Sequence, residues 1–178
     1  MTMKCCSGIR SLTNVNRLAI FVGMALLTVS RVPLGAESSA FNGRWVLDKN
    51  QSQGSDLPLG LEQRVKQSGP EITIESKFNE PPTGVVPLVY LGIMTTTLKL
   101  DANGQEVQNQ IGPFQQASKT TVNGNQMETE WRAMVKGDEV TGHWVRTIAD
   151  DGKSMEMAIQ EKSTQGQHGE ATLRFVKK

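Results

Sequence analysis

Residues 127–148 read Met-Glu-Thr-Glu-Trp-Arg-Ala-Met-Val-Lys-Gly-Asp-Glu-Val-Thr-Gly-His-Trp-Val-Arg-Thr-Ile, and this stretch decides the fold class. Before Gly137-Asp138, Met127, Trp131 and Val135 share one face, while Glu128 and its charged neighbours share the other. The same alternation resumes after the glycine. A period of two with one apolar face is typical of strands that have one side in a core. The stretch therefore predicts a β-hairpin.

Turn signals of the same kind recur along the chain. Asn103-Gly104, Asn123-Gly124 and Asp151-Gly152 supply the backbone conformations that tight hairpins need. No window of ten or more residues has a convincing helical stripe. The strands expected outside the opening stretch are Gly43–Asp48, Leu61–Gln67, Glu71–Phe78 (after a Ser68-Gly69-Pro70 turn), Thr95–Leu100, a weak strand near Gln105–Gln110, and strands around Met155–Gln160 and Leu173–Phe175.

The sequence thus predicts an all-β domain, an antiparallel meander of eight to ten strands. So many twisted strands do not stay flat, and closing the sheet removes the edges that attract other chains. We expect a closed barrel of the size that holds side chains or one small ligand. A two-sheet β-sandwich is the alternative, because the periodicity fits both.

Two stretches lie outside this pattern. Gln51–Gly60 is polar, contains Gly and Pro, and is expected to be a loop. Asn79–Met94 is rich in proline and ends in the apolar run Leu88–Met94, which could be a strand, a lid over an opening or an exposed patch. An exposed patch there would mark a site for a protein partner.

The N-terminus has the pattern of a secretory signal. A basic segment without acidic residues leads into twelve uncharged residues, 18–29, and then to Ala36. That length fits a signal peptide and is short of the ~20 residues that a membrane span needs. We expect residues 1–36 to be removed, residues 37–42 to form a short lead and residues 43–178 to form one β domain. Cleavage after Ala40 and an uncleaved anchor are the alternatives.

Cysteine usage and charge follow from this division. Cys5 and Cys6 would leave with the signal, and a domain without cysteine favours a periplasmic or secreted bacterial protein. Four of the nineteen basic residues and none of the eighteen acidic ones precede Ala36, so the domain has a net charge of about −3. Without a basic run, a nucleic-acid partner is not expected. No membrane span is expected after signal removal.

Gly43-Arg44-Trp45, at the head of the first expected strand, resembles the N-terminal signature of lipocalins and their calycin relatives. The resemblance implies a barrel whose bottom is closed by Trp45, with an arginine from a late strand packed across its ring. Arg146 is the expected arginine, because it shares the face of Trp144 and a guanidinium is attracted to an indole face. More broadly, the chain resembles small secreted lipocalin-like proteins of bacteria. It has neither the second lipocalin motif nor a C-terminal helix.

The apolar faces supply a candidate site. Methionine adapts to loosely specified apolar ligands, and tryptophan offers a large apolar surface. The side chains expected to bind a small apolar ligand are Trp131, Trp144, Met127, Met155, Met157, Ile74 and Leu98. Alternatively, these side chains simply fill a core. Arg146 is expected to have the structural role given above rather than to bind an anionic head group.

No pattern in the sequence indicates catalysis. There is no Gly-x-Ser-x-Gly elbow and no phosphate loop, and His143 and His168 are isolated and expected to be solvated. We expect no catalytic residue, metal site or cofactor. The sequence therefore favours an exported binding protein for a small hydrophobic or amphiphilic molecule. A structural or protein-interaction domain of the cell envelope, with a filled core, is the alternative.

Overall fold

The computed structural model describes residues 39–54, 57–80 and 93–178. The predicted signal peptide and most of the Leu88–Met94 run lie outside these ranges. Of that run, Ile93 is half-buried against the core and Met94 is 40% exposed. By their internal contacts, the described residues belong to one compact unit. Within the described ranges, no helix is long and apolar enough to cross a membrane.

The described residues form an antiparallel meander of ten strands with one short strand at its side. A single 3₁₀ turn, η1 (Lys49–Gln51), follows the first strand. The strands are β1 (Gly43–Leu47), β2 (Gln53–Gly54), β3 (Leu61–Ser68), β4 (Glu71–Phe78), β5 (Thr95–Asp101), β6 (Val107–Ile111), β7 (Phe114–Asn123), β8 (Gln126–Val135), β9 (Asp138–Ile148), β10 (Ser154–Ser163) and β11 (His168–Lys177).

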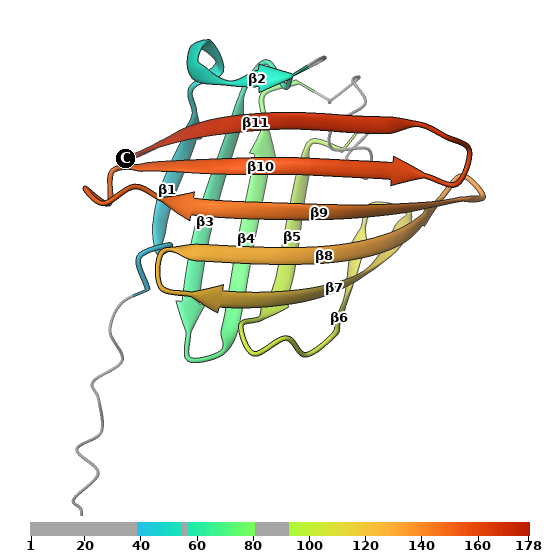
Figure 1. The fold of residues 1–178 in the computed structure, drawn as a ribbon, viewed down its shortest axis with the longest axis horizontal. Coiled ribbons are helices and arrows are strands. Elements are labelled where there is room, and N and C mark those ends of the chain that lie inside the picture. The colour runs from blue at the N-terminus through green and yellow to red at the C-terminus, as the bar shows by residue number, and fades with distance from the viewer. Residues whose placement is uncertain (1–38, 55–56, 81–92) are drawn as a thin grey trace, which may run out of the picture. The chain divides into compact units, whose positions relative to one another are not determined.

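Pairing between the first and last strands bends this meander into a barrel. β1 pairs with β3 on one side and with β11 on the other, so the strand order runs β5-β4-β3-β1-β11-β10-β9-β8-β7-β6. In Figure 1 the long strands β7 to β11 cross in front of the steeper β1, β3, β4 and β5. One continuous, nearly closed sheet confirms the predicted barrel and excludes the two-sheet sandwich.

The two ends of the order, β5 and β6, meet at a seam that a side chain bridges. The amide of Asn109 accepts from the backbone N–H of Lys99 at 2.7 Å and donates to the Lys99 carbonyl at 3.0 Å. It thus makes the pair of bonds that a neighbouring strand would make. The β5–β6 loop also bonds directly to β7: the backbone N–H of Gly104 donates to the Thr120 carbonyl at 2.9 Å.

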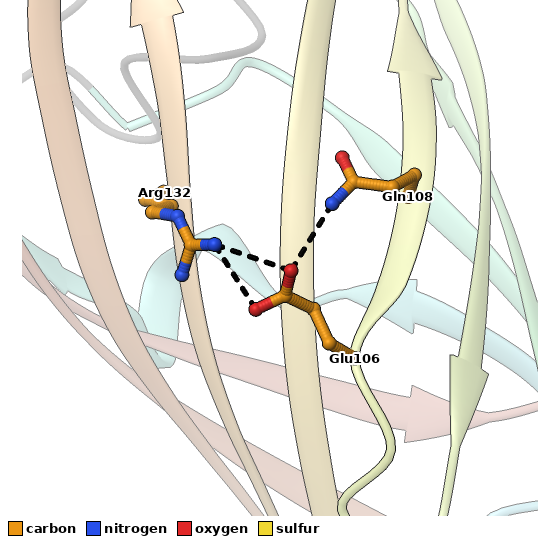
Figure 2. Close-up of polar contacts among 3 residues, drawn as sticks. All are labelled: Glu106, Gln108 and Arg132. Carbon is orange, nitrogen blue, oxygen red and sulfur yellow. Dashed lines mark hydrogen bonds and ion pairs between the residues drawn. The ribbon is translucent and has the colours of Figure 1, made fainter.

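On the outer surface, an ion pair also holds the β5–β6 loop. Nη2 of Arg132, on β8, lies 3.1 Å from both carboxylate oxygens of Glu106, and Gln108 donates to the same carboxylate at 3.2 Å (Figure 2). Both charged side chains are partly exposed, so the pair contributes about 0–1 kcal/mol. Arg132 nonetheless links β8 across β7 to the end of the loop, just before β6.

Most predicted strands and turns agree with the structure to within a residue or two. Two differences have a physical reason. The predicted loop at Gln51–Gly60 contains the end of η1 and β2, whose two residues pair with Ala171 and Thr172 of β11. β7 was not predicted, because its buried positions carry polar side chains and the chain there shows no apolar period of two.

Candidate functional site

All seven side chains predicted to bind an apolar ligand are buried on the inner face of the barrel. Two walls contribute them. On β4 and β5, Ile74 and Leu98 lie directly opposite each other. The facing strands β8, β9 and β10 contribute Trp131, Trp144, Met127, Met155 and Met157. Their shared location is as predicted, whereas a role in binding stays a prediction.

Arg146 lies in the middle of the second wall. Its neighbours across the strands are Met127 on β8 and Met157 on β10. The guanidinium is fully buried and packs over the ring of Trp144, with 5.6 Å from Cζ to the ring centroid. Arg146 is therefore buried on the inner face, and the ring over which it packs is that of Trp144.

At the beginning of β1, Trp45 is fully buried and its indole N–H donates to the Phe41 carbonyl at 2.8 Å. The cation recorded over its ring is Lys177, with Nζ 4.9 Å from the ring centroid. Lys177 also donates to the Ala40 carbonyl, which ties the end of β11 to the segment before β1. The pairing of Trp45 with Arg146 stays a prediction.

Trp131 and Trp144 form a tilted pair with ring centroids 5.3 Å apart. Gly142 makes room for it, because a Cβ at that position would lie 2.2 Å from Nε1 of Trp131. The indole N–H of Trp144 donates to the carboxylate of Glu161 at 3.0 Å. Sequence reasoning missed Glu161, although the alternation of Met155, Met157 and Ile159 places it on the same inner face.

A second set of inward-facing side chains is polar, and sequence reasoning missed it as well. On β3, β4 and β5, three neighbouring positions carry Gln63, Ser76 and Thr96, which we call the β3–β5 polar row. Four more form the β7–β8 polar row, namely Gln116, Ser118, Thr120 and Thr129. The signal that could have revealed the second row is a mostly polar segment of ten residues bounded by two turns, Gly112-Pro113 and Asn123-Gly124.

Within each polar row, some of the side-chain polar atoms are hydrogen-bonded to one another. Thr120 and Thr129 bond to each other at 3.0 Å. Each glutamine donates its side-chain N–H to a serine hydroxyl, Gln63 to Ser76 at 3.1 Å and Gln116 to Ser118 at 3.0 Å. The rows are therefore ordered networks rather than loosely placed polar side chains.

Besides Oε1 of Gln67, near the end of β3, four buried polar atoms of this interior have no hydrogen-bond partner among the described residues. They are Oε1 of Gln63, Oγ1 of Thr96, Oε1 of Gln116 and Nε1 of Trp131. A buried polar atom without a partner costs about 1–3 kcal/mol. Native proteins keep few such atoms, and each of them calls for an explanation.

Where β9 begins, Asp138 joins two hairpin turns. The Thr164 hydroxyl, in the β10–β11 turn, donates to the Asp138 carboxylate. This hydrogen bond is the main cause that holds the pKa of Asp138 below its usual value, and Ser163 and nearby backbone N–H groups add to it. Asp138 is 8% exposed, and its role is to hold the two turns together.

A groove of about 640 Å³ at β7 to β11 is lined by side chains of both charges and by both histidines, and also by Trp131, Gly142 and Glu161. His143 does not stand alone there, because its Nε2 lies 2.6 Å from the carboxylate of Glu128. His168 is exposed. Across the described part of the chain, no group of three His, Cys, Asp or Glu side chains is placed to hold a metal ion.

These features define the class of fold. A nearly closed antiparallel barrel of ten meandering strands, with an enclosed face that is part apolar and part polar, is a lipocalin-like (calycin-type) barrel. No family model matches the chain, and no curated protein sequence matches it.

Among solved structures, the chain is similar to two secretory abundant heat soluble proteins of Ramazzottius varieornatus. One has a TM-score of 0.55 at 13% identity, over 79% of this chain and 97% of that one. The other, protein 4, has a TM-score of 0.50 at 12% identity, over 79% and 96%. Fatty-acid-binding protein 1 of Echinococcus granulosus has a TM-score of 0.49 at 16% identity, over 78% and 97%. At such identities the likeness shows the fold alone.

Proposed function

We propose that this protein is an exported carrier that binds one small amphiphilic molecule inside the barrel, without catalysis. The observation that carries the proposal is the composition of the inner face. A wall of methionines and tryptophans, with Arg146 at its middle, adjoins polar rows with four unpartnered atoms. In a filled structural core such atoms would only lower stability. A ligand with an apolar and a polar part matches both regions.

The size of the barrel supports the same proposal. Barrel diameter grows with strand number, and eight strands already enclose side chains or one small ligand. This barrel has ten strands in its closing order, and several inward positions carry small side chains such as Ser76, Ser118, Ala133 and Ala171. Burying about 200 Å² of apolar ligand surface there would contribute about 5 kcal/mol to binding.

Export is part of the proposal and rests on the sequence of residues 1–36. Cleavage after Ala36 would leave every described residue in the mature chain, including the buried Phe41 and Trp45. The apolar ligand is likewise a proposal, and the barrel interior supports it.

The test is a titration with N-phenyl-1-naphthylamine, a neutral fluorophore whose emission rises in apolar surroundings. We expect saturable binding of one molecule per chain. Ala133→Phe adds bulk to a buried inward position of β8 and should weaken binding at least about tenfold, because overpacking displaces a ligand that shares the space.

Met134→Phe is the matched control, because Met134 is the next residue of β8, faces outward and is 57% exposed. This variant should bind like the wild type, and both variants are first checked for cooperative thermal unfolding. Absence of saturable binding by the wild type would contradict the proposal and favour a filled core. Equal binding by all three proteins would place the fluorophore outside the barrel.

A further inference from the structure

The four unpartnered atoms occupy one arc of the barrel. Gln63 and Thr96 lie on β3 and β5, and Gln116 and Trp131 lie on β7 and β8. In the strand order these positions flank the β5–β6 seam from its two sides. The residues are between 0% and 9% exposed. A ligand that reaches this arc would meet hydrogen-bonding atoms that bulk water does not reach.

The two glutamines repeat one arrangement. In each, Nε2 donates to the hydroxyl of a serine on the inner face, at 3.1 Å for Gln63 and 3.0 Å for Gln116. This bond fixes the amide and leaves its Oε1 without a partner among the described residues. Both oxygens are therefore oriented acceptors before any ligand arrives, and orienting a group in advance lowers the entropic cost of binding.

The chemistry of these atoms restricts the ligand. A glutamine Oε1 only accepts, the indole N–H of Trp131 only donates, and the Thr96 hydroxyl does both. An ionised carboxylate cannot donate, so in this arc it would leave the two amide oxygens unsatisfied. The buried guanidinium of Arg146 lies outside the arc, on β9, where it packs over the ring of Trp144. An ammonium group cannot accept, so it would leave the indole N–H unsatisfied. Uncharged hydroxyl and carbonyl groups together satisfy all four atoms.

We infer that the ligand is an uncharged lipid with several hydroxyl or carbonyl groups, of which a monoacylglycerol is the simplest example. This inference rests on the proposed function and names the class of molecule bound at the same site. The apolar chain packs against the wall of β8, β9 and β10, and the polar end lies in the arc from β3 to β8. Hydroxyl groups donate to Oε1 of Gln63 and Gln116, and a carbonyl accepts from Nε1 of Trp131.

The experiment compares three probes with the same twelve-carbon chain: 1-monolauroylglycerol, laurate and dodecyltrimethylammonium. Each is titrated below its critical micelle concentration, and binding is followed by displacement of N-phenyl-1-naphthylamine. We expect 1-monolauroylglycerol to bind at least about tenfold more tightly than either charged probe, since a buried hydrogen bond left unmade is costly.

The variant Gln116→Met keeps the length of the side chain and removes the unpartnered oxygen. The variant should bind 1-monolauroylglycerol about fivefold to tenfold more weakly and bind laurate with unchanged affinity. It should unfold at the same or a higher temperature than the wild type. Gln115→Met is the matched control, because Gln115 is exposed and precedes Gln116 in β7. It should change neither affinity.

Each outcome separates the inference from the proposed function. If the fluorophore binds but laurate binds as tightly as 1-monolauroylglycerol, the barrel is a carrier and the inference of an uncharged ligand is wrong. If Gln116→Met binds 1-monolauroylglycerol like the wild type, the unpartnered oxygen does not contact the ligand and the inference is overturned. If the fluorophore itself does not bind, the proposed function fails first.

Discussion

Gly142 lies beneath the indole of Trp131 and allows the two tryptophans to approach each other. No positive φ is involved, so the requirement is for space rather than for backbone freedom. Two strands must place a glycine and a tryptophan directly opposite each other, as β8 and β9 do. The pattern of one strand does not reveal this pairing, because it depends on the register between two strands.

We predict that Gly142→Ala moves Trp131 and destabilises the barrel by about 1–3 kcal/mol, as overpacking a core does. The new Cβ would lie 2.2 Å from Nε1 of Trp131, in a space that is already filled. The measurements are urea unfolding and the near-ultraviolet circular dichroism of the tryptophan pair. Thr141→Ala, at the neighbouring outward-facing position, should leave both unchanged; a stable Gly142→Ala with a native spectrum would contradict the predicted packing.

At the same scale, the sequence allows some buried residues to be predicted and hides others. The inward direction of Arg146 follows from its shared face with Trp144, and the structure buries both. Glu161 obeys the same alternation, yet a carboxylate next to Lys162 is easily taken for a solvated one. Its hydrogen bond from Trp144 comes from a different strand, which a local pattern cannot show.

At the scale of elements, strands were predictable where one face is apolar. β8, β9 and β10 alternate clearly, and Glu71–Phe78 agrees in both bounds with β4. β7 was missed because Gln116, Ser118 and Thr120 occupy its inner face. The polarity that conceals β7 in the sequence is the same property that makes the barrel interior a candidate binding site. The bridge of Asn109 to β5 was equally hidden, because it replaces a backbone ladder by a side chain.

Two turns are joined by an ionised group, which gives a pH dependence. The pKa of Asp138 is held below its usual value, chiefly by the hydrogen bond from Thr164. A carboxyl group whose pKa is lower in the folded chain stabilises the fold above its unfolded pKa of about 3.9. That contribution is lost as the pH falls through the folded pKa.

We predict that Thr164→Val lowers the unfolding temperature at pH 7 and that the difference from the wild type shrinks as the pH falls from 4 towards 2. Thermal unfolding across this range measures it. Gln165→Ala, in the same turn, should follow the wild type at every pH. A difference that stays constant into acid would show that Thr164 acts independently of the charge of Asp138.

For the whole molecule, the pairing of β1 with β11 turns a meander into an enclosed interior. Composition and turn spacing led to the barrel, but neither determines whether the inside is a solid core. That distinction depends on side chains from strands far apart in the sequence, such as Gln63 of β3 and Gln116 of β7. Their unpartnered oxygens, beside an apolar wall, are the reason to regard the barrel as a carrier.

The methionines allow ligand binding inside the barrel to be tested directly. Met127, Met155 and Met157 are buried on the inner wall, whereas Met134 is 57% exposed on the outside of β8. With ¹³C-labelled methionine methyl groups, NMR can follow all four during a titration with 1-monolauroylglycerol. We expect the three inner signals to shift together and to saturate at one ligand per chain while the Met134 signal stays in place. Shifts confined to Met134, or no shift at all, would contradict binding inside the barrel.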